Sequence, residues 1–242
     1  PKTPRYGRTV LFTLDFLIEE SITDFPVDPF SIIKNNNWGL VKYSEFAKFQ
    51  GKTLREVIKG FQSEDGWVYF DGKHYTIYYN DKKTPPDRIR FTLMHEIGHI
   101  YLGHLTDFSE TALKRGGLSK QKYEVLEDEA NAFARNVLAP APIVKKLRLR
   151  TPQDLITAFS ITCSAALTRL GLLRIDLKHA KNFSRYLIDY FKHFIDSFSN
   201  RWDCPNCLHT FIDKKPNYCP ICKNSELFKN IGGGIGMIYS KI

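Results

Sequence analysis

The stretch FTLMHEIGHIYLGH, from Phe91 to His104, decides the fold, because it places three histidines and a glutamate in what otherwise reads as an apolar helix. Each helical residue advances by about 100°, so His95 and His99 lie about 40° apart and one turn along. Both imidazoles can therefore reach one ion. This is the His-Glu-x-x-His spacing of zinc sites, since neutral imidazole nitrogens bind zinc at about 2.0 to 2.1 Å.

Glu96 lies one step further round this helix, near a bound metal without needing to bind it. A carboxylate there can take a proton from water that zinc has acidified to a pKa of about 7, which predicts Glu96 as the catalytic base. The alternative is that the two histidines are surface or core residues in a helix that matches by chance. The position of this helix just after a β-rich segment favours zinc.

His104 does not fit the same centre on a continuous helix. It follows His95 by nine residues, which is about 180° round the helix axis. It could bind the metal only if the helix broke at Gly103. We therefore predict a structural role for His104.

A catalytic zinc usually has three protein ligands and one water, so a third ligand is expected. The predicted helix 120–138 carries the acidic residues Glu124, Glu127, Asp128 and Glu129. On a helical wheel, Glu127 alone falls inside the apolar arc, and Glu129 falls beyond its edge. A lone carboxylate on a buried stripe is costly unless it is paired or binds a metal, which predicts Glu127 as the third ligand. The alternative is a buried salt bridge to an arginine.

Two motifs together resemble the ImmA/IrrE family of zinc metallopeptidases. They are HEIGHIYLGH and EDEANAFARNVLAP, the second running from Glu127 to Pro140. In the family pattern the glutamate three residues before Ala-Asn is a metal ligand, and it corresponds to Glu127. The resemblance covers roughly residues 30 to 175. Its small departure is Val-Leu-Ala-Pro at 137–140, where the family pattern has Leu-Leu-Met-Pro. It implies a bacterial, phage or mobile-element protease that cuts helix-turn-helix repressors.

Two cysteine pairs near the end of the chain predict a second, structural zinc. They are Cys204-Pro-Asn-Cys207 and Cys219-Pro-Ile-Cys222, and each places two thiolates on one tight turn. Four cysteine ligands close the coordination shell, and the segment resembles a zinc ribbon that acts as a recognition or docking module. Disulfides are the alternative. The fifth cysteine, Cys163, lies in an apolar run and reads as a small core residue.

The net charge of +9 is unevenly placed. Residues 1–139 carry 19 Lys and Arg against 19 Asp and Glu, whereas residues 140–242 carry 16 against 7. A basic half suggests a nucleic-acid partner, although a solvated basic helix face is the commoner explanation. The ribbon region 200–242, with 6 against 3, is too balanced to decide between protein and nucleic acid.

The remaining patterns complete a prediction of the architecture. Helical spacing occurs at 8–22 and 28–37, a β-hairpin at 67–80 around Asp71-Gly72, helices at 87–101 and 120–138, and further helices from Thr151-Pro152 to about residue 200. We predict an α+β protein: a zincin-like metallopeptidase domain at 1–175 with a small mixed β-sheet and the HExxH helix, a helical extension at 176–200, and the zinc ribbon at 201–242. The chain shows no signal peptide and no apolar run of membrane-spanning length, which predicts a cytoplasmic protein that does not contact membranes.

The predicted function is zinc-dependent endoproteolysis, with one catalytic and one structural Zn²⁺. The substrate is expected to be a DNA-binding repressor, and the strand Tyr75–Asn80 is a candidate for pairing with it as an added β-strand. His104, Tyr101 and Arg135 are weak candidates for stabilising the oxyanion. Two alternatives stay open: a DNA-associated binding protein with a zincin fold and little hydrolytic activity, and an assembly or toxin–antitoxin component of a phage or mobile element.

Overall fold

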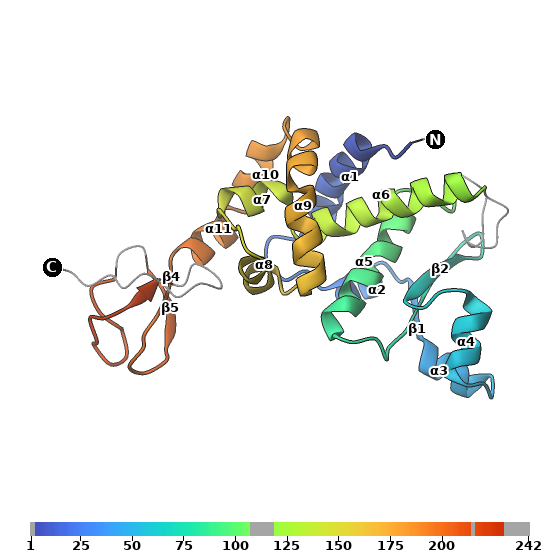
Figure 1. The fold of residues 1–242 in the computed structure, drawn as a ribbon, viewed down its shortest axis with the longest axis horizontal. Helices are drawn as coiled ribbons and strands as arrows, with labels where there is room; N and C mark the ends of the chain where they lie inside the picture. The colour runs from blue at the N-terminus through green and yellow to red at the C-terminus, as the bar shows by residue number, and fades with distance from the viewer. Residues whose placement is uncertain (1–2, 107–118, 214–215, 230–242) are drawn as a thin grey trace. The chain divides into compact units, whose positions relative to one another are not determined.

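The computed structural model describes residues 3–106, 119–213 and 216–229 (Figure 1). The chain forms two compact units. The first contains Pro1–Ile22 and Val27–Leu138, and the second contains Thr23–Pro26 and Ala139–Ile242. The mixture of helices and small sheets confirms the predicted α+β class. The domain boundaries at residues 175 and 200 remain predictions.

The first unit contains a three-stranded mixed sheet with strand order β1-β3-β2. The predicted hairpin is present, formed by β2 (Gly66–Phe70) and β3 (Tyr75–Tyr79) in antiparallel pairing. Its turn contains Gly72 with a φ of 94°, a conformation that glycine adopts at little cost. A further strand, β1 (Gly39–Lys42), pairs with β3 in parallel. β3 is therefore the central strand, and β2 is at an edge.

This strand order contradicts the hypothesis that Tyr75–Asn80 pairs with a substrate. Both sides of β3 already carry backbone hydrogen bonds, to β1 on one side and to β2 on the other. A strand with two neighbours has no free edge for a third. β1 was not predicted from the sequence, because it is only four residues long and lacks strand-like alternation of buried and exposed positions.

Helices surround this sheet and carry the predicted site. Those described in the first unit are α1 (Tyr6–Glu19), α2 (Pro29–Asn35), α3 (Tyr43–Phe49), α4 (Leu54–Phe61), α5 (Pro86–Tyr101) and α6 (Lys120–Leu138). The helices predicted at 8–22, 87–101 and 120–138 are thereby confirmed as α1, α5 and α6. Asp28 caps α2, as predicted, by accepting a hydrogen bond from the Phe30 amide at 3.0 Å. In Figure 1, α5 runs beside α6, and α1 packs on α6.

Gly98 allows α5 and α6 to approach closely. A Cβ atom at Gly98 would lie 3.1 Å from Phe133 Cδ1 and 3.4 Å from the Ala130 Cα. Phe133 is fully buried, so its ring has little room to move away. The glycine of the HEIGH motif thus has a packing role, which is to bring the face of α5 that carries the histidines against α6.

The second unit begins with short helices around an aromatic cluster. They are α7 (Ala141–Lys146), α8 (Pro152–Phe159), α9 (Cys163–His179), α10 (Ser184–Tyr190) and α11 (Lys192–Ser199). Thr151 caps α8, as predicted, by accepting a hydrogen bond from the Asp154 amide at 3.2 Å. Phe25 stacks on Phe191 with ring centroids 4.8 Å apart. Cys163 is exposed as the first residue of α9, so its prediction as a core residue is wrong.

No single helix among the residues that the structure describes is long and apolar enough to cross a membrane. Within the described residues, α8 and α9 together have the length and apolar composition of such a span, but the chain bends by 111° at the break between them. Within α9, Arg169 and Asp176 form a fully buried ion pair with a distance of 2.6 Å. Each charge on the inner face of α9 is therefore neutralised inside the unit.

The second unit ends in a small antiparallel sheet that carries the cysteine pairs. Its strands β4 (Arg201–Asp203), β5 (Thr210–Ile212) and β6 (Phe228–Lys229) have the order β5-β4-β6. Trp202 and Leu227 pack with two of the cysteines in a core of only a few residues. This fits the predicted zinc ribbon, and the last residues of that prediction, 230–242, lie outside the described residues.

The close approach at Gly98 generates a stability prediction. We expect Gly98→Val to lower the free energy of unfolding by about 1 to 3 kcal/mol, because the added methyl groups have no room between α5 and α6. The matched control is Gly60→Val in α4, where an added Cβ has nothing within 4 Å. Thermal unfolding followed by circular dichroism checks this, and equal melting temperatures for the two variants would contradict it.

Candidate metal centre

Helix α5 presents His95 and His99 to one point. The two residues are one turn apart on the helix, and their Nε2 atoms are 3.0 Å from each other. The His99 side chain is buried, with 2 % of its surface exposed, whereas His95 is exposed to 13 %. The pair therefore lies at the inner end of a site that solvent reaches past His95.

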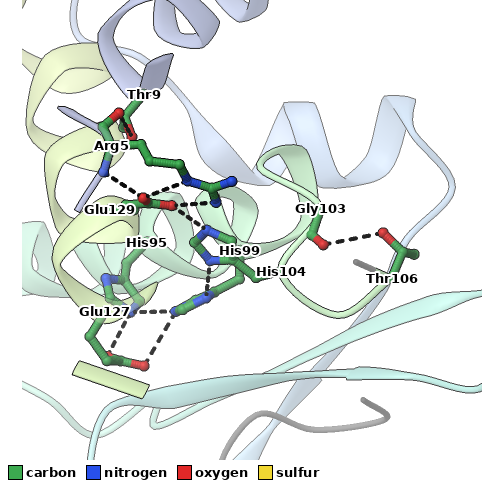
Figure 2. Close-up of polar contacts among 9 residues, drawn as sticks. All are labelled: Arg5, Thr9, His95, His99, Gly103, His104, Thr106, Glu127 and Glu129. Atoms are coloured by element: carbon green, nitrogen blue, oxygen red, sulfur yellow. Dashed lines mark hydrogen bonds and ion pairs between the residues drawn. The ribbon is translucent and has the colours of Figure 1, made fainter. Parts of the chain in front are cut away.

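Glu127 of α6 completes the group that the sequence predicted. Its Oε2 lies 3.3 Å from His95 Nε2, and its Oε1 lies 3.4 Å from His99 Nε2 (Figure 2). Donor atoms of the three residues lie within 4.8 Å of one another. Two helices that are distant in sequence thus bring two imidazoles and one carboxylate together.

The spacing of these donor atoms fits zinc. Ligands bound at about 2.0 to 2.1 Å in a tetrahedron are separated by about 3.3 Å. The observed separations of 3.0, 3.3 and 3.4 Å are close to that value. Two nitrogens and one oxygen are also the ligand set of zinc peptidases, in which the fourth position is left for water.

The far nitrogens of both histidines are held by hydrogen bonds. His95 Nδ1 lies 3.0 Å from Asn131 Oδ1, which can only accept, so this nitrogen donates. His99 Nδ1 lies 2.9 Å from the Nδ1 atom of His104. These contacts leave both Nε2 atoms directed at Glu127, which is the orientation that a metal ligand needs.

The charge states also suit a divalent cation. Burial lowers the pKa of His99 to about 3, so this imidazole is neutral near pH 7. Burial raises the pKa of Glu127, but its contacts with both histidines outweigh burial and hold the pKa well below the usual range. For His95, burial lowers the pKa, and the hydrogen bond to Glu127 and the charge of Glu96 outweigh it and raise the pKa.

Glu96 lies beside this group in a pocket of about 290 Å³. Its side chain is buried, and its Oε1 would be 3.7 Å from a Cβ atom added to Gly66 of β2. Among the described residues that could hold a metal together, it is not one of the converging three. The structure therefore places Glu96 where the sequence predicted it, near the site without belonging to the ligand set.

The pocket also contains a residue that the sequence analysis missed. Tyr123 of α6 lines it, whereas none of the three oxyanion candidates named from the sequence does so. One of them, Tyr101, donates its hydroxyl hydrogen to Glu19 at 2.7 Å. Burial, the nearby charge of Glu127 and a hydrogen bond to the Glu127 carboxylate raise the pKa of Tyr123, so its hydroxyl stays protonated. The sequence did contain a signal for Tyr123, because a residue four positions before Glu127 lies on the same face of the helix.

Glu129 is the main error of the helical-wheel argument. It was placed beyond the apolar arc, yet its side chain is exposed to only 1 %, against 30 % for Glu127. Its carboxylate is paired with Arg5 Nη2 at 2.9 Å and with His104 Nε2 at 3.2 Å. The wheel could not foresee these partners, because they belong to other segments of the chain.

The four cysteines of the second pattern form a separate cluster. Their sulfur atoms lie within 4.8 Å of one another. Cys204 Sγ is 3.5 Å from Cys222 Sγ, and Cys207 Sγ is 3.6 Å from Cys219 Sγ. A disulfide bond is about 2.05 Å long, so these are free thiols, whereas sulfurs around one tetrahedral zinc are about 3.8 Å apart. The cluster fits a structural zinc.

The two cysteine turns have the same backbone structure. The Leu208 amide donates to Cys204 O at 2.9 Å, and the Lys223 amide donates to Cys219 O at 3.0 Å. Leu208 and Lys223 both have left-handed conformations, with φ of 56° and 61°. A non-glycine residue rarely adopts this conformation, so its repetition shows that the two turns share one backbone geometry, as two halves of a single four-cysteine site would.

Comparison with known protein families gives one match. The sequence profile of the IrrE N-terminal-like domain, a peptidase family, matches residues 47–171. The matched range includes α5 and α6 with the three converging residues, and it excludes α1 and the four cysteines. A comparison with curated proteins found no match.

The two clusters predict the metal content of the protein. We expect elemental analysis of the purified chain to find two zinc ions, one for each group of converging donors. Glu127→Ala should reduce this to one, because removal of a ligand weakens the histidine site and leaves the cysteine site intact. The control is Glu124→Ala, an exposed glutamate on the same helix. A content of one zinc per chain in the wild type would show that one of the two predicted sites does not bind zinc.

Proposed function

The chain belongs to the peptidase family defined by the IrrE N-terminal-like domain, and on this basis we propose that it is a zinc-dependent endopeptidase acting inside the cell. One observation carries the proposal. The donor atoms of His95, His99 and Glu127 converge at the wall of a pocket that also holds the buried carboxylate of Glu96. A protein that only binds a partner has no need of that fourth side chain.

In this proposal, three residues hold the metal and Glu96 moves the proton. A bound zinc ion supplies Lewis acidity, which polarises a peptide carbonyl and makes water easier to deprotonate. Glu96 accepts the proton of the attacking water as the new carbon–oxygen bond forms. It then delivers the proton to the amide nitrogen as the carbon–nitrogen bond breaks, so it is unchanged at the end of the cycle.

The edge strand β2 is the better candidate for aligning the substrate. Gly66, Trp67 and Val68 of this strand line the pocket beside the converging residues. An extended peptide added next to an edge strand gains main-chain hydrogen bonds over several residues. We propose that the substrate lies along β2, so that its scissile bond passes the metal ligands.

The substrate we propose is a DNA-binding repressor of the helix-turn-helix type. Support comes from the resemblance of the two motifs to the ImmA/IrrE family and from the excess of basic residues after residue 140. A basic surface raises the local concentration of a chain near nucleic acid, where such a substrate is found. The setting that fits this activity is the cytoplasm of a bacterium, with a phage or mobile element as the source of the regulated genes.

The role of Glu96 gives the central test. We expect Glu96→Gln to keep both zinc ions and to cut the repressor encoded beside its gene about 10²- to 10⁴-fold more slowly, because the amide cannot accept the proton. Mass spectrometry of the fragments over time measures the rate. Glu124→Gln, a change of the same kind on an exposed face of α6, is the control. An unchanged cleavage rate in Glu96→Gln would contradict the assignment of Glu96 as the catalytic base.

Tyr123 is the residue we propose for stabilising the oxyanion. It lines the pocket and keeps its proton, and in this proposal its hydroxyl exchanges the hydrogen bond to Glu127 for one to the negative oxygen that develops on the carbonyl.

We expect Tyr123→Phe to lower kcat by about 10²- to 10³-fold with zinc content unchanged, since a single oxyanion donor is worth that much. Tyr101→Phe is the matched control, because that hydroxyl donates to Glu19 outside the pocket. Steady-state kinetics on the same repressor separates the two, and equal kcat values would exclude Tyr123 from this role.

A further inference from the structure

A line of hydrogen bonds, buried as far as Glu129, extends from the metal centre to the start of α1 (Figure 2). His99 Nδ1 lies 2.9 Å from His104 Nδ1, and His104 Nε2 lies 3.2 Å from Glu129 Oε2. The side chains of His99, His104 and Glu129 are exposed to 2 %, 0 % and 1 %. Arg5, just before α1, contacts the far side of Glu129. None of these contacts is part of the chemical step described above.

Gly103 explains why His104 reaches this position. On a continuous helix His104 would point away from the centre, but α5 ends at Tyr101 and Gly103 adopts a left-handed conformation with φ of 73°. The chain turns back, and the His104 amide donates to His99 O at 3.0 Å. A break of the helix near Gly103 was the condition under which His104 could have been a metal ligand. The break brings His104 to the far nitrogen of His99 instead of to the metal.

The hydrogen bonds define where each proton lies. Glu129 accepts from Arg5 three times, from the backbone amide at 2.6 Å, from Nε at 3.0 Å and from Nη2 at 2.9 Å. A carboxylate held in this way is ionised and can only accept, so His104 Nε2 must donate to it. In a neutral His104 the other nitrogen, Nδ1, then accepts from His99 Nδ1. His99 is left with the lone pair on Nε2, directed at Glu127.

From this arrangement we propose that His104 is a positioning residue for His99, and that Arg5 and Glu129 hold His104 in the tautomer that this task requires. The proposal rests on the proposed metal site. It gives a role in metal affinity to Arg5, which lies outside the range 47–171 that matches the peptidase family. Partners of this kind, which orient a metal-binding imidazole through its other nitrogen, typically contribute 10- to 100-fold in metal affinity.

A merely structural role predicts something different. Arg5 and Glu129 form an ion pair between two packed helices, and such a pair could serve only to join α1 to α6. Loss of that pair would lower the melting temperature and leave the proton of His99 where it is. The tautomer of His99 is therefore the property that separates positioning from simple packing.

The experiment uses the full chain and compares His104→Phe with His104→Asn. Phenylalanine keeps a ring in the buried site but can neither accept from His99 nor donate to Glu129. Asparagine places its amide oxygen near the position of Nδ1, so it can restore the acceptor. Long-range ¹⁵N–¹H spectra of the imidazole rings report the tautomer of His99 without zinc, and competition with a chelator gives the zinc Kd of the histidine site.

We expect wild-type His99 to be protonated on Nδ1 alone. In His104→Phe the two tautomers should mix and the Kd should rise about 10- to 100-fold, whereas His104→Asn should recover most of the loss. Arg5→Met should act in the same direction, and it keeps the test possible if His104→Phe does not fold. Its control is Arg8→Met, because the Arg8 guanidinium lies over the Phe12 ring, 4.7 Å from the centroid.

Two results would overturn the inference, and they are distinguishable. In the first, the wild type binds zinc at the histidine site, and His104→Phe and Arg5→Met leave the His99 tautomer and the zinc Kd unchanged. This result excludes the positioning role and leaves the peptidase proposal intact. Failure of the wild-type histidine site to bind zinc removes both proposals together. Cleavage activity is not needed for either outcome.

Discussion

The direct contact between α5 and α6 is the constraint on which the rest of the first unit depends. At Gly98 α5 contributes no side chain to the contact, and Phe133 and Ala130 of α6 lie directly against the backbone of α5. This approach places Glu127 within 3.4 Å of nitrogens on the other helix. The site is therefore a product of helix packing, and its geometry is fixed by buried apolar atoms rather than by loops.

Helix α6 contributes two carboxylates with opposite surroundings. Glu127 and Glu129 are two positions apart, which separates them by about 200° round the helix. Glu127 faces the pocket and its negative charge stands next to two imidazoles, whereas Glu129 faces α1 and is neutralised by Arg5. His99 and His104, the buried histidines that link the two carboxylates, are both hydrogen-bonded. The free-energy cost of burying these polar side chains is therefore largely offset.

Patterns of short range were sufficient to predict much of this molecule. The periodicity of a helix placed His95 and His99 on one face, and the spacing of the cysteines placed four sulfurs in one cluster, because both depend on residues close in sequence. Glu127 was found from the apolar stripe of its own helix. The family motifs point to the same residue.

The errors at Glu129 and at β3 share a physical cause, which is a partner distant in sequence. Glu129 looked peripheral because its stabilising arginine is 124 positions away. β3 looked like an edge because its parallel neighbour, β1, is too short to leave a recognisable pattern. His104 could not be oriented without knowing that Gly103 reverses the chain, whereas Tyr123 carried a sequence signal, since it lies four residues before Glu127 on the same helix face.

The long separation of Arg5 from Glu129 also affects how the chain matures. The ribosome releases Arg5 and α1 first, and Arg5 can contact Glu129 only after α6 has been synthesised and can dock. A contact that spans so many residues forms late in folding, since closing a large loop costs entropy before the contact offsets it. The hydrogen bonds that run from Arg5 through Glu129 and His104 to His99 can therefore be complete only after α6 has been synthesised.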